Sequence, residues 1–296
     1  MDLTSIISIG RARTKEGIVA DYIPELAKQN PNLIACGVQD NKGGIYVAGD
    51  YKDTFSLQSI TKVFSLILAL SRYGEEALYE KVGFQSSAQP FNTLEGLDEP
   101  PYRAPNPMLN SGAIAVTGML GNEVAENLIE YIKTWTKYDN FFVDGQVALS
   151  EEETGYRNMA IGYLMKSRNR IEGSVEQVLR EYFRQCAIST DTEGLLRLAG
   201  WMASGYRGID ESKISNDRIQ RLVMAMMLTG GLYDGSTKFV ANTTVPAKSG
   251  VGGGILAYKP GNYGYAVFGP ALDSNGNSIG GLSMLEELVK ITEGSL

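Results

Sequence analysis

Two short β-hairpin patterns lie at opposite ends of this 296-residue chain, and they constrain its fold more than any other feature. The apolar, β-rich runs cover residues 32–37, 44–48, 254–258 and 264–268, and a turn-rich tetrapeptide joins the two runs of each pair. A single two-stranded hairpin is barely stable in water. We therefore expect both hairpins to join into one antiparallel sheet, covered by helices predicted over about residues 15–29 and 282–292.

The middle of the chain has mainly helical periodicity. Helix starts are indicated by two capping-box patterns, Ser150-Glu151-Glu152-Glu153 and Thr190-Asp191-Thr192-Glu193. No repeat or low-complexity linker divides the chain. We expect one catalytic domain over residues 1–296, of α/β (α+β) class. Its discontinuous α/β part would cover about residues 1–58 and 229–296, and an inserted helical part about residues 59–228.

Charge and residue counts exclude several classes of function. Twenty-seven Lys and Arg face 34 Asp and Glu, a net charge of −7, so neither nucleic acid nor an anionic membrane surface is expected as a partner. The chain has no histidine, which excludes a Ser-His-Asp triad, a Cys-His dyad and any metal held by imidazole. We expect no metal site, and the chemistry must use a different base.

The two cysteines and the N-terminal segment indicate where the protein works. Cys36 and Cys186 lie far apart and form neither a C-x-x-C pair nor a secreted disulfide framework. The first residues contain no uninterrupted apolar signal core, and no apolar run is long enough to span a bilayer. A cytoplasmic protein is expected.

Ser59 and Lys62 form the only S-x-x-K pattern of the chain, at the start of a helix that is apolar on nearly every face and is therefore buried. Residues three apart share one helix face, so the amine can reach the hydroxyl. Burial disfavours the ammonium form and should lower the pKa of Lys62. A neutral amine could then take the serine proton. The alternative is an N-cap serine followed by a lysine that extends to solvent.

Lys248-Ser249-Gly250 is the only K-[ST]-G pattern, and it leads into a predicted strand. A plain glycine-rich turn is one alternative, and a phosphate-binding loop is another, although this tract lacks the G-x-x-x-x-G-K-[ST] order. S-x-x-K followed much later by K-[ST]-G is the pattern of serine β-lactamases and penicillin-binding proteins, which need no histidine. This pair favours acyl transfer through a nucleophilic serine.

Longer segments make the resemblance more specific. Seven of them, in order and over most of the chain, resemble the serine-dependent glutaminase family of bacteria, within the β-lactamase-like superfamily: DYIPELA (21–27), FSLQSITKVFSLILAL (55–70), PNPMLNSGAIAV (105–116), SEEETGYRNMAIG (150–162), YFRQCAIS (182–189), LTGGLYD (228–234) and PAKSGVGGGILA (246–257). The resemblance implies a β-lactamase/transpeptidase-like fold, with an antiparallel sheet, flanking helices and an inserted helical subdomain. It also implies hydrolysis of L-glutamine to L-glutamate and ammonia without any cofactor.

The same resemblance assigns the reacting groups. It implies a γ-glutamyl ester on Ser59, with Lys62 as its base and Tyr182 and Tyr233 as further proton-transfer partners. The backbone N–H of Val251 would form an oxyanion hole with that of Ser59. Which of the lysine and the two tyrosines is the base in each half-reaction stays open.

Free glutamine carries an ammonium and a carboxylate that both need partners. Glu151 and Asn158 are seven residues apart on one predicted helix, hence on one face, and Glu151 is the candidate for the ammonium. The family pattern adds Asn110 and Tyr22. Each of these residues also has a structural explanation, as a cap, a helix-dipole partner or a packed aromatic.

Two more residues are expected at the substrate site, and two other functions are open alternatives. Lys248 and Ser249 are also expected at the substrate site, and for Lys248 a purely electrostatic role is an open alternative. The family implies a homo-oligomer, a dimer or a tetramer. A β-lactamase or peptidase of the same fold is an alternative, but it would need an export signal. A binding or sensor module without turnover is another.

Overall fold

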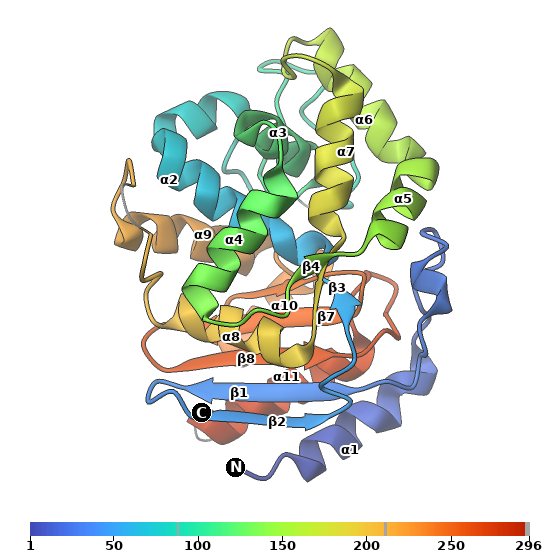
Figure 1. The fold of residues 1–296 in the computed structure, drawn as a ribbon, viewed down its shortest axis with the longest axis vertical. Helices are drawn as coiled ribbons and strands as arrows, with labels where there is room; N and C mark the ends of the chain where they lie inside the picture. Colours follow the sequence, from blue (N-terminus) through green and yellow to red (C-terminus); the bar gives the residue numbers. More distant parts are fainter. Residues whose placement is uncertain (88, 210–211, 294–296) are drawn as a thin grey trace.

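A five-stranded antiparallel sheet unites the two ends of the chain (Figure 1). The computed structural model describes residues 1–87, 89–209 and 212–293. The strand order is β2-β1-β8-β7-β6, with strands β1 (Ala35–Asp40), β2 (Ile45–Gly49), β6 (Ala247–Ser249), β7 (Gly254–Lys259) and β8 (Tyr263–Phe268). The expected hairpins are β1–β2 and β7–β8, and they join because β1 pairs with β8, with Cys36 opposite Val267. Both hairpin predictions are confirmed.

Helices cover both faces of this sheet. One face packs against α11 (Ile279–Glu293), which in turn packs against α1 (Thr4–Arg13), and the other packs against α8 (Thr192–Ala203). Alternate strand residues supply the two cores: Val38 and Val267 join the α11 cluster, whereas Ala266 and Phe268 join the α8 cluster. The predicted C-terminal helix is therefore confirmed.

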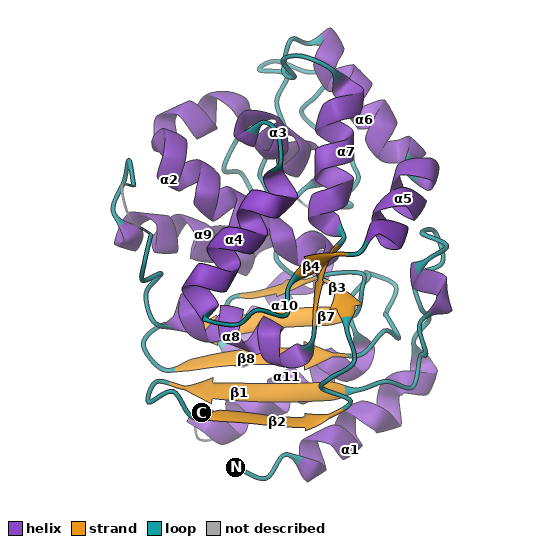
Figure 2. Cartoon of the chain, in the orientation of Figure 1, coloured by secondary structure: helices purple, strands orange, loops and turns teal. Residues whose placement is uncertain are grey.

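The remaining helices lie beside the β6 edge of the sheet (Figure 2), except that α10 packs against α11. They are α2 (Thr61–Lys81), α3 (Asn110–Leu120), α4 (Val124–Thr136), α5 (Gly145–Thr154), α6 (Tyr156–Ser167), α7 (Val175–Cys186), α9 (Asn216–Gly230) and α10 (Ser236–Thr243). A small second sheet has the order β3-β5-β4, from β3 (Phe55–Ser56), β4 (Phe142–Val143) and β5 (Ile188–Thr190). Residues 61–71 of α2 are almost entirely buried, as its all-round apolar pattern predicts.

The prediction of a helix over residues 15–29 is wrong. Helix α1 lies earlier, and the segment that follows holds only the 3₁₀ turns Thr14–Glu16 and Leu26–Lys28. Between them Gly17 is extended and Ile18 bridges to Leu272, near the C-terminal end of the chain. A long-range pairing therefore replaces local helix here.

Two expected helix starts are shifted. Helix α5 begins before Ser150, because Asp144 caps it by accepting from the N–H groups of Gln146 and Val147. Helix α8 begins next to the expected cap, and Asp191 caps it by accepting from Gly194. In both cases an aspartate, rather than the expected Ser or Thr, supplies the cap.

Helix α8 lies within residues 59–228, the range expected to form the helical part, yet it packs on the main sheet. The division of the chain into an α/β part and a helical part stays a prediction. Among the helices that the structure describes, none has the length and apolar character needed to cross a membrane.

Candidate active site

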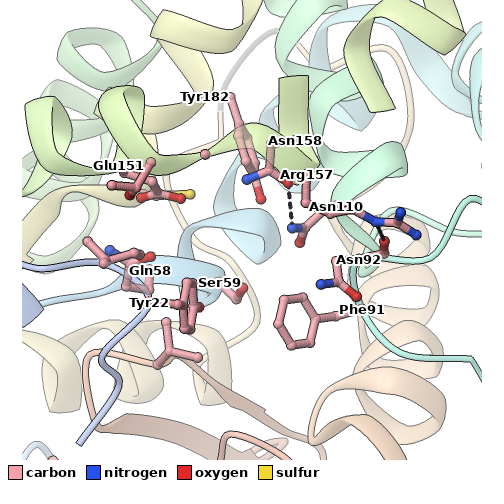
Figure 3. A pocket seen from close by; sticks show the side chains of 15 residues that line it. Tyr22, Gln58, Ser59, Phe91, Asn92, Asn110, Glu151, Arg157, Asn158 and Tyr182 are labelled. Carbon is pink, nitrogen blue, oxygen red and sulfur yellow. Dashed lines mark hydrogen bonds between the residues drawn. The ribbon is translucent and has the colours of Figure 1, made fainter. Parts of the chain in front are cut away.

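A cavity of about 140 Å³ opens where the starts of α2 and α3, the junction of α5 and α6, and α7 meet (Figure 3). Seven of the residues expected at the site line it: Tyr22, Ser59, Asn110, Glu151, Asn158, Tyr182 and Val251. The other four expected residues do not line the cavity but lie against its wall: Lys62, Tyr233, Lys248 and Ser249. Residues far apart in sequence thus meet in one place.

Ser59 lies in a tight turn at the floor of this cavity. Strand β3 ends at Ser56, a 3₁₀ turn covers Gln58–Ile60, and α2 follows directly. Gln58 has a φ of 50°, in the left-handed region that a non-glycine residue seldom adopts. The hydroxyl of Thr61 donates to the carbonyl of Gln58 at 2.8 Å and secures the turn. Ser59 is 9% exposed, and it lines the cavity.

The glycine-rich tract packs directly against this turn. A Cβ on Gly250 would lie 2.1 Å from the carbonyl oxygen of Leu57, and one on Gly252 would lie 2.1 Å from that of Ser56. Only glycine permits such a backbone contact. Between these glycines Val251 faces the cavity. Across the described residues, neither its N–H nor that of Ser59 donates a hydrogen bond to the chain, so two donors remain for a bound group.

Lys62 is buried behind Asn110. Its amine donates to Asn110 Oδ1 at 2.6 Å and to the carbonyl of Met108 at 3.1 Å. Burial lowers the pKa of Lys62 to about 8, against a smaller raising effect from Cys186 and Glu151. The expected contact with Ser59 is not a hydrogen bond here, because the serine lies in a 3₁₀ turn before the helix rather than in its first regular turn.

Tyr233 lies beside Ser59 on the other side. Burial raises the pKa of Tyr233, whereas the nearby hydroxyls of Ser59 and Ser249 lower it, although no hydrogen bond of regular geometry reaches the phenol within the described chain. The amine of Lys248 lies 4.5 Å from the centre of the Tyr233 ring. The phenol of Tyr233 thus lies close enough to Ser59 for the serine hydroxyl to act on it.

Glu151 supplies a buried carboxylate at another part of the cavity. It is 5% exposed, and its Oε2 atom has no hydrogen-bond partner among the described residues. Burial raises the pKa of Glu151 to about 8, against the hydrogen bond from Gln58 and the charge of Lys62. A buried carboxylate with an unused oxygen can accept a cation.

Glu151 and Asn158 do not share a helix, contrary to expectation. Helix α5 ends after Thr154, and Gly155 has non-helical backbone angles before α6 begins. Both side chains nevertheless line the cavity. The Nδ2 of Asn110 donates to Asn158 Oδ1 at 2.8 Å, which links the two amides. Tyr182 is buried beside them, and burial raises its pKa well above the ordinary value.

Several wall residues were not expected from the sequence: Gln58, Phe91, Asn92, Arg157 and Cys186. Gln58 and Arg157 directly precede Ser59 and Asn158, so adjacency to an expected residue was the available signal. Phe91 and Asn92 come from the segment between α2 and α3, where no periodicity marks them. The Nε of Arg157 donates to the carbonyl of Asn92 at 2.9 Å.

Comparisons with known proteins identify the family of the chain. The family model for Glutaminase matches residues 17–296. A glutaminase of Clostridium tetani is 40% identical over 97% of this chain and 95% of its own length. A glutaminase of Fusobacterium nucleatum is 37% identical over 97% of this chain and 96% of its own.

Solved structures give the same result for the fold. The crystal structure of a probable glutaminase of Bacillus subtilis is 30% identical, with a TM-score of 0.86 over 99% of this chain and 96% of that one. A Bacillus subtilis glutaminase in covalent complex with 5-oxo-L-norleucine, formed by reaction with 6-diazo-5-oxo-L-norleucine, is 31% identical, with a TM-score of 0.84 over 99% of this chain and 98% of that one. The expected fold class is confirmed.

Proposed function

The chain belongs to the glutaminase family and is an amidohydrolase, and we propose that it hydrolyses L-glutamine to L-glutamate and ammonia through a γ-glutamyl ester on Ser59. Ser59 would attack the γ-carbonyl carbon, and the C–N bond would break as ammonia leaves. Water would then cleave the ester, release glutamate and restore the serine hydroxyl.

The size and polarity of the cavity support glutamine as the substrate. A cavity of about 140 Å³ has room for a small molecule, and polar side chains lie along its wall. The unused oxygen of Glu151 can accept the α-ammonium, which would favour the ionised carboxylate when substrate binds. Asn110, Asn158 and Tyr182 offer polar groups for the α-carboxylate. Tyr22 completes the wall near Ser59.

We propose two groups that move the proton of Ser59, Lys62 as its acceptor and Tyr233 as a relay. A pKa of about 8 leaves a usable fraction of Lys62 neutral near neutral pH. The phenol of Tyr233 touches Ser59, so it can pass the proton onward or donate to the leaving nitrogen. We propose that Lys62 and Tyr233 together replace histidine, with Tyr182 as a further hydrogen-bond donor beside the cavity. Lys248 and Ser249 would support Tyr233 from behind.

One observation carries this proposal: Ser59 and Val251 line the same cavity, and the backbone N–H of each donates to no atom of the described chain. The N–H groups of Ser59 and Val251 can donate to the oxygen that becomes negative when the serine attacks. Removing one such donor in other acyl-transfer enzymes costs about 10²- to 10³-fold in kcat.

The direct test is Ser59→Ala, with Ser71→Ala, a buried serine of α2 that does not line the cavity, as the matched control. We expect Ser59→Ala to lose glutamine-dependent ammonia release by about 10⁴-fold or more, with unchanged thermal unfolding. Acid-quenched wild-type enzyme should carry a glutamyl group on the peptide that contains Ser59. Full activity in Ser59→Ala would overturn the proposal.

We also propose a cellular location and an oligomeric state for the enzyme. Both cysteines are free and buried, in keeping with a reducing cytoplasm. The family resemblance supports a homo-oligomer, a dimer or a tetramer, and light scattering of the purified protein would test it.

A further inference from the structure

A second cavity, of about 490 Å³, adjoins the proposed glutamine site. Three residues, Tyr22, Phe91 and Val251, line both cavities. Figure 3 shows Tyr22 and Phe91 on either side of Ser59, across the cavity from Tyr182 and Asn158. The second cavity therefore borders the end of the first at which Ser59 would attack.

The position of this shared wall identifies what could enter the second cavity. A substrate held by its α-groups at Glu151 and Asn158 presents its γ-amide nitrogen at Ser59. In glutamine that nitrogen carries only hydrogens, so glutamine leaves the second cavity unused. We propose that this cavity receives the substituent of an N-substituted γ-glutamyl amide, so that the enzyme also cleaves this class of substrate.

This inference rests on the proposed acyl-enzyme and adds no new chemistry. The Ser59 oxygen forms its bond to the γ-carbon while the C–N bond breaks, and the substituted amine leaves with the proton taken from the serine. Water then cleaves the same glutamyl ester as before. Only the leaving group differs: it is a substituted amine, larger than ammonia, and its substituent would bind in the second cavity.

The charges around the second cavity favour a substituent with a positive charge. Glu16, Asp21 and Asp273 line it, and none of its described lining residues is Lys or Arg. Asp21 forms no ion pair with the described chain, and there the carboxylate of Asp273 accepts only from the backbone N–H groups of Asn275 and Asn277. Glu16 pairs with Arg13 at 2.6 Å, outside the lining. Within the described chain, the carboxylates of Asp21 and Asp273 therefore have no cationic partner.

Two probes of equal size test both parts of the inference. They are the γ-glutamyl amides of propylamine and of ethylenediamine, which differ only by a terminal methyl or ammonium group. We expect the enzyme to release both amines, and to prefer the ethylenediamine amide by about two- to fivefold in kcat/KM. Equal kcat/KM for the two amides would overturn the role of the carboxylates.

Variants separate this site from the catalytic one. Ser274 is exposed, lines only the second cavity and forms no side-chain hydrogen bond within the described chain, so Ser274→Trp should fill that cavity. We expect this variant to lose at least tenfold in kcat/KM for both substituted amides and to keep glutamine hydrolysis within twofold. Equal losses for glutamine and the amides, or none for the amides, would overturn the proposal.

Removing single charges tests the selectivity. Asp21→Asn and Asp273→Asn should each reduce the preference for the ethylenediamine amide by about twofold, because each partly exposed carboxylate contributes little. Asp139→Asn, an exposed aspartate that lines neither cavity, is the matched control and should leave the preference unchanged. A wild-type enzyme that cleaves glutamine but neither amide would overturn this inference alone. Failure to cleave glutamine would overturn the proposed function.

Discussion

Lys62 and Lys248 are two lysines buried to the same degree in very different surroundings. They are 1% and 0% exposed, and each amine donates to two oxygens of the chain. Lys62 has the side-chain amide of Asn110 as one partner and a buried carboxylate, Glu151, close enough to raise its pKa. The partners of Lys248 are the backbone carbonyls of Gly231 and Ser249.

The difference shows how a fold can set two lysines to different tasks with equal burial. Burial lowers the pKa of Lys62 only to about 8, whereas burial and the charge of Lys62 lower the pKa of Lys248 well below its ordinary value. Lys62 can therefore both lose and regain a proton near neutral pH. The amine of Lys248 contacts the ring of Tyr233 and two backbone carbonyls, which suits a support rather than a base.

The largest effect is expected from Lys62→Met, which removes the amine and keeps the length of the side chain. We expect kcat for glutamine to fall by about 10³- to 10⁴-fold, since a general base contributes up to that much. In the wild type, activity should rise with pH through about 8, as Lys62 loses its proton. A Lys62→Met enzyme that kept substantial activity with this same rise would exclude Lys62 as the base.

A smaller effect should follow Glu151→Gln, which tests what distinguishes the two lysines. We expect kcat/KM for glutamine to fall by about 10²-fold, because the substrate ammonium loses its charged partner. Since Glu151 raises the pKa of Lys62, the rise of activity with pH should also move to lower pH. Hydrolysis of N-acetylglutamine, which lacks the ammonium, serves as the control: an equal loss on both substrates would contradict this role.

The smallest effect is expected from Lys248→Met, the matched variant at the second lysine. We expect kcat to fall by less than about tenfold, because the amine contacts only carbonyls and one face of Tyr233. The pH at which activity rises should stay where it is, since the pKa of Lys62 is set by its burial, Cys186 and Glu151. A loss of kcat as large as that of Lys62→Met would contradict the assignment of Lys62 as the base and Lys248 as a support. Thermal unfolding of both variants would control for misfolding.

Much of this arrangement could be predicted from local sequence. The hairpins carry their turn residues and their alternation within a few residues, so their prediction needed no distant contact. Ser59 and Lys62 were recognisable by spacing and by the apolar helix around them. The predictions failed where contacts between distant segments determine the local structure. Ile18 pairs with Leu272, and the helix expected over residues 15–29 does not form.

The proton partners show a second limit of sequence reasoning. Spacing placed the Lys62 amine at Ser59, but the amine instead meets Asn110, 48 residues further along the chain. Phe91 and Asn92 form part of the wall from a segment with no periodic pattern. Likewise Glu151 and Asn158 reach one cavity across a helix break at Gly155 rather than along one helix. Only the folded chain brings these groups together.

The packing of Gly250 and Gly252 against the Ser59 turn has a consequence for synthesis on the ribosome. Ser59 and Lys62 are synthesised early, but the glycine-rich tract that packs against their turn, with the Val251 N–H, belongs to the last fifth of the polypeptide. A growing chain would carry its nucleophile for most of translation without the group proposed to stabilise negative charge. Premature termination should therefore yield inert fragments, and hydrolysis should begin only once the C-terminal hairpin has docked.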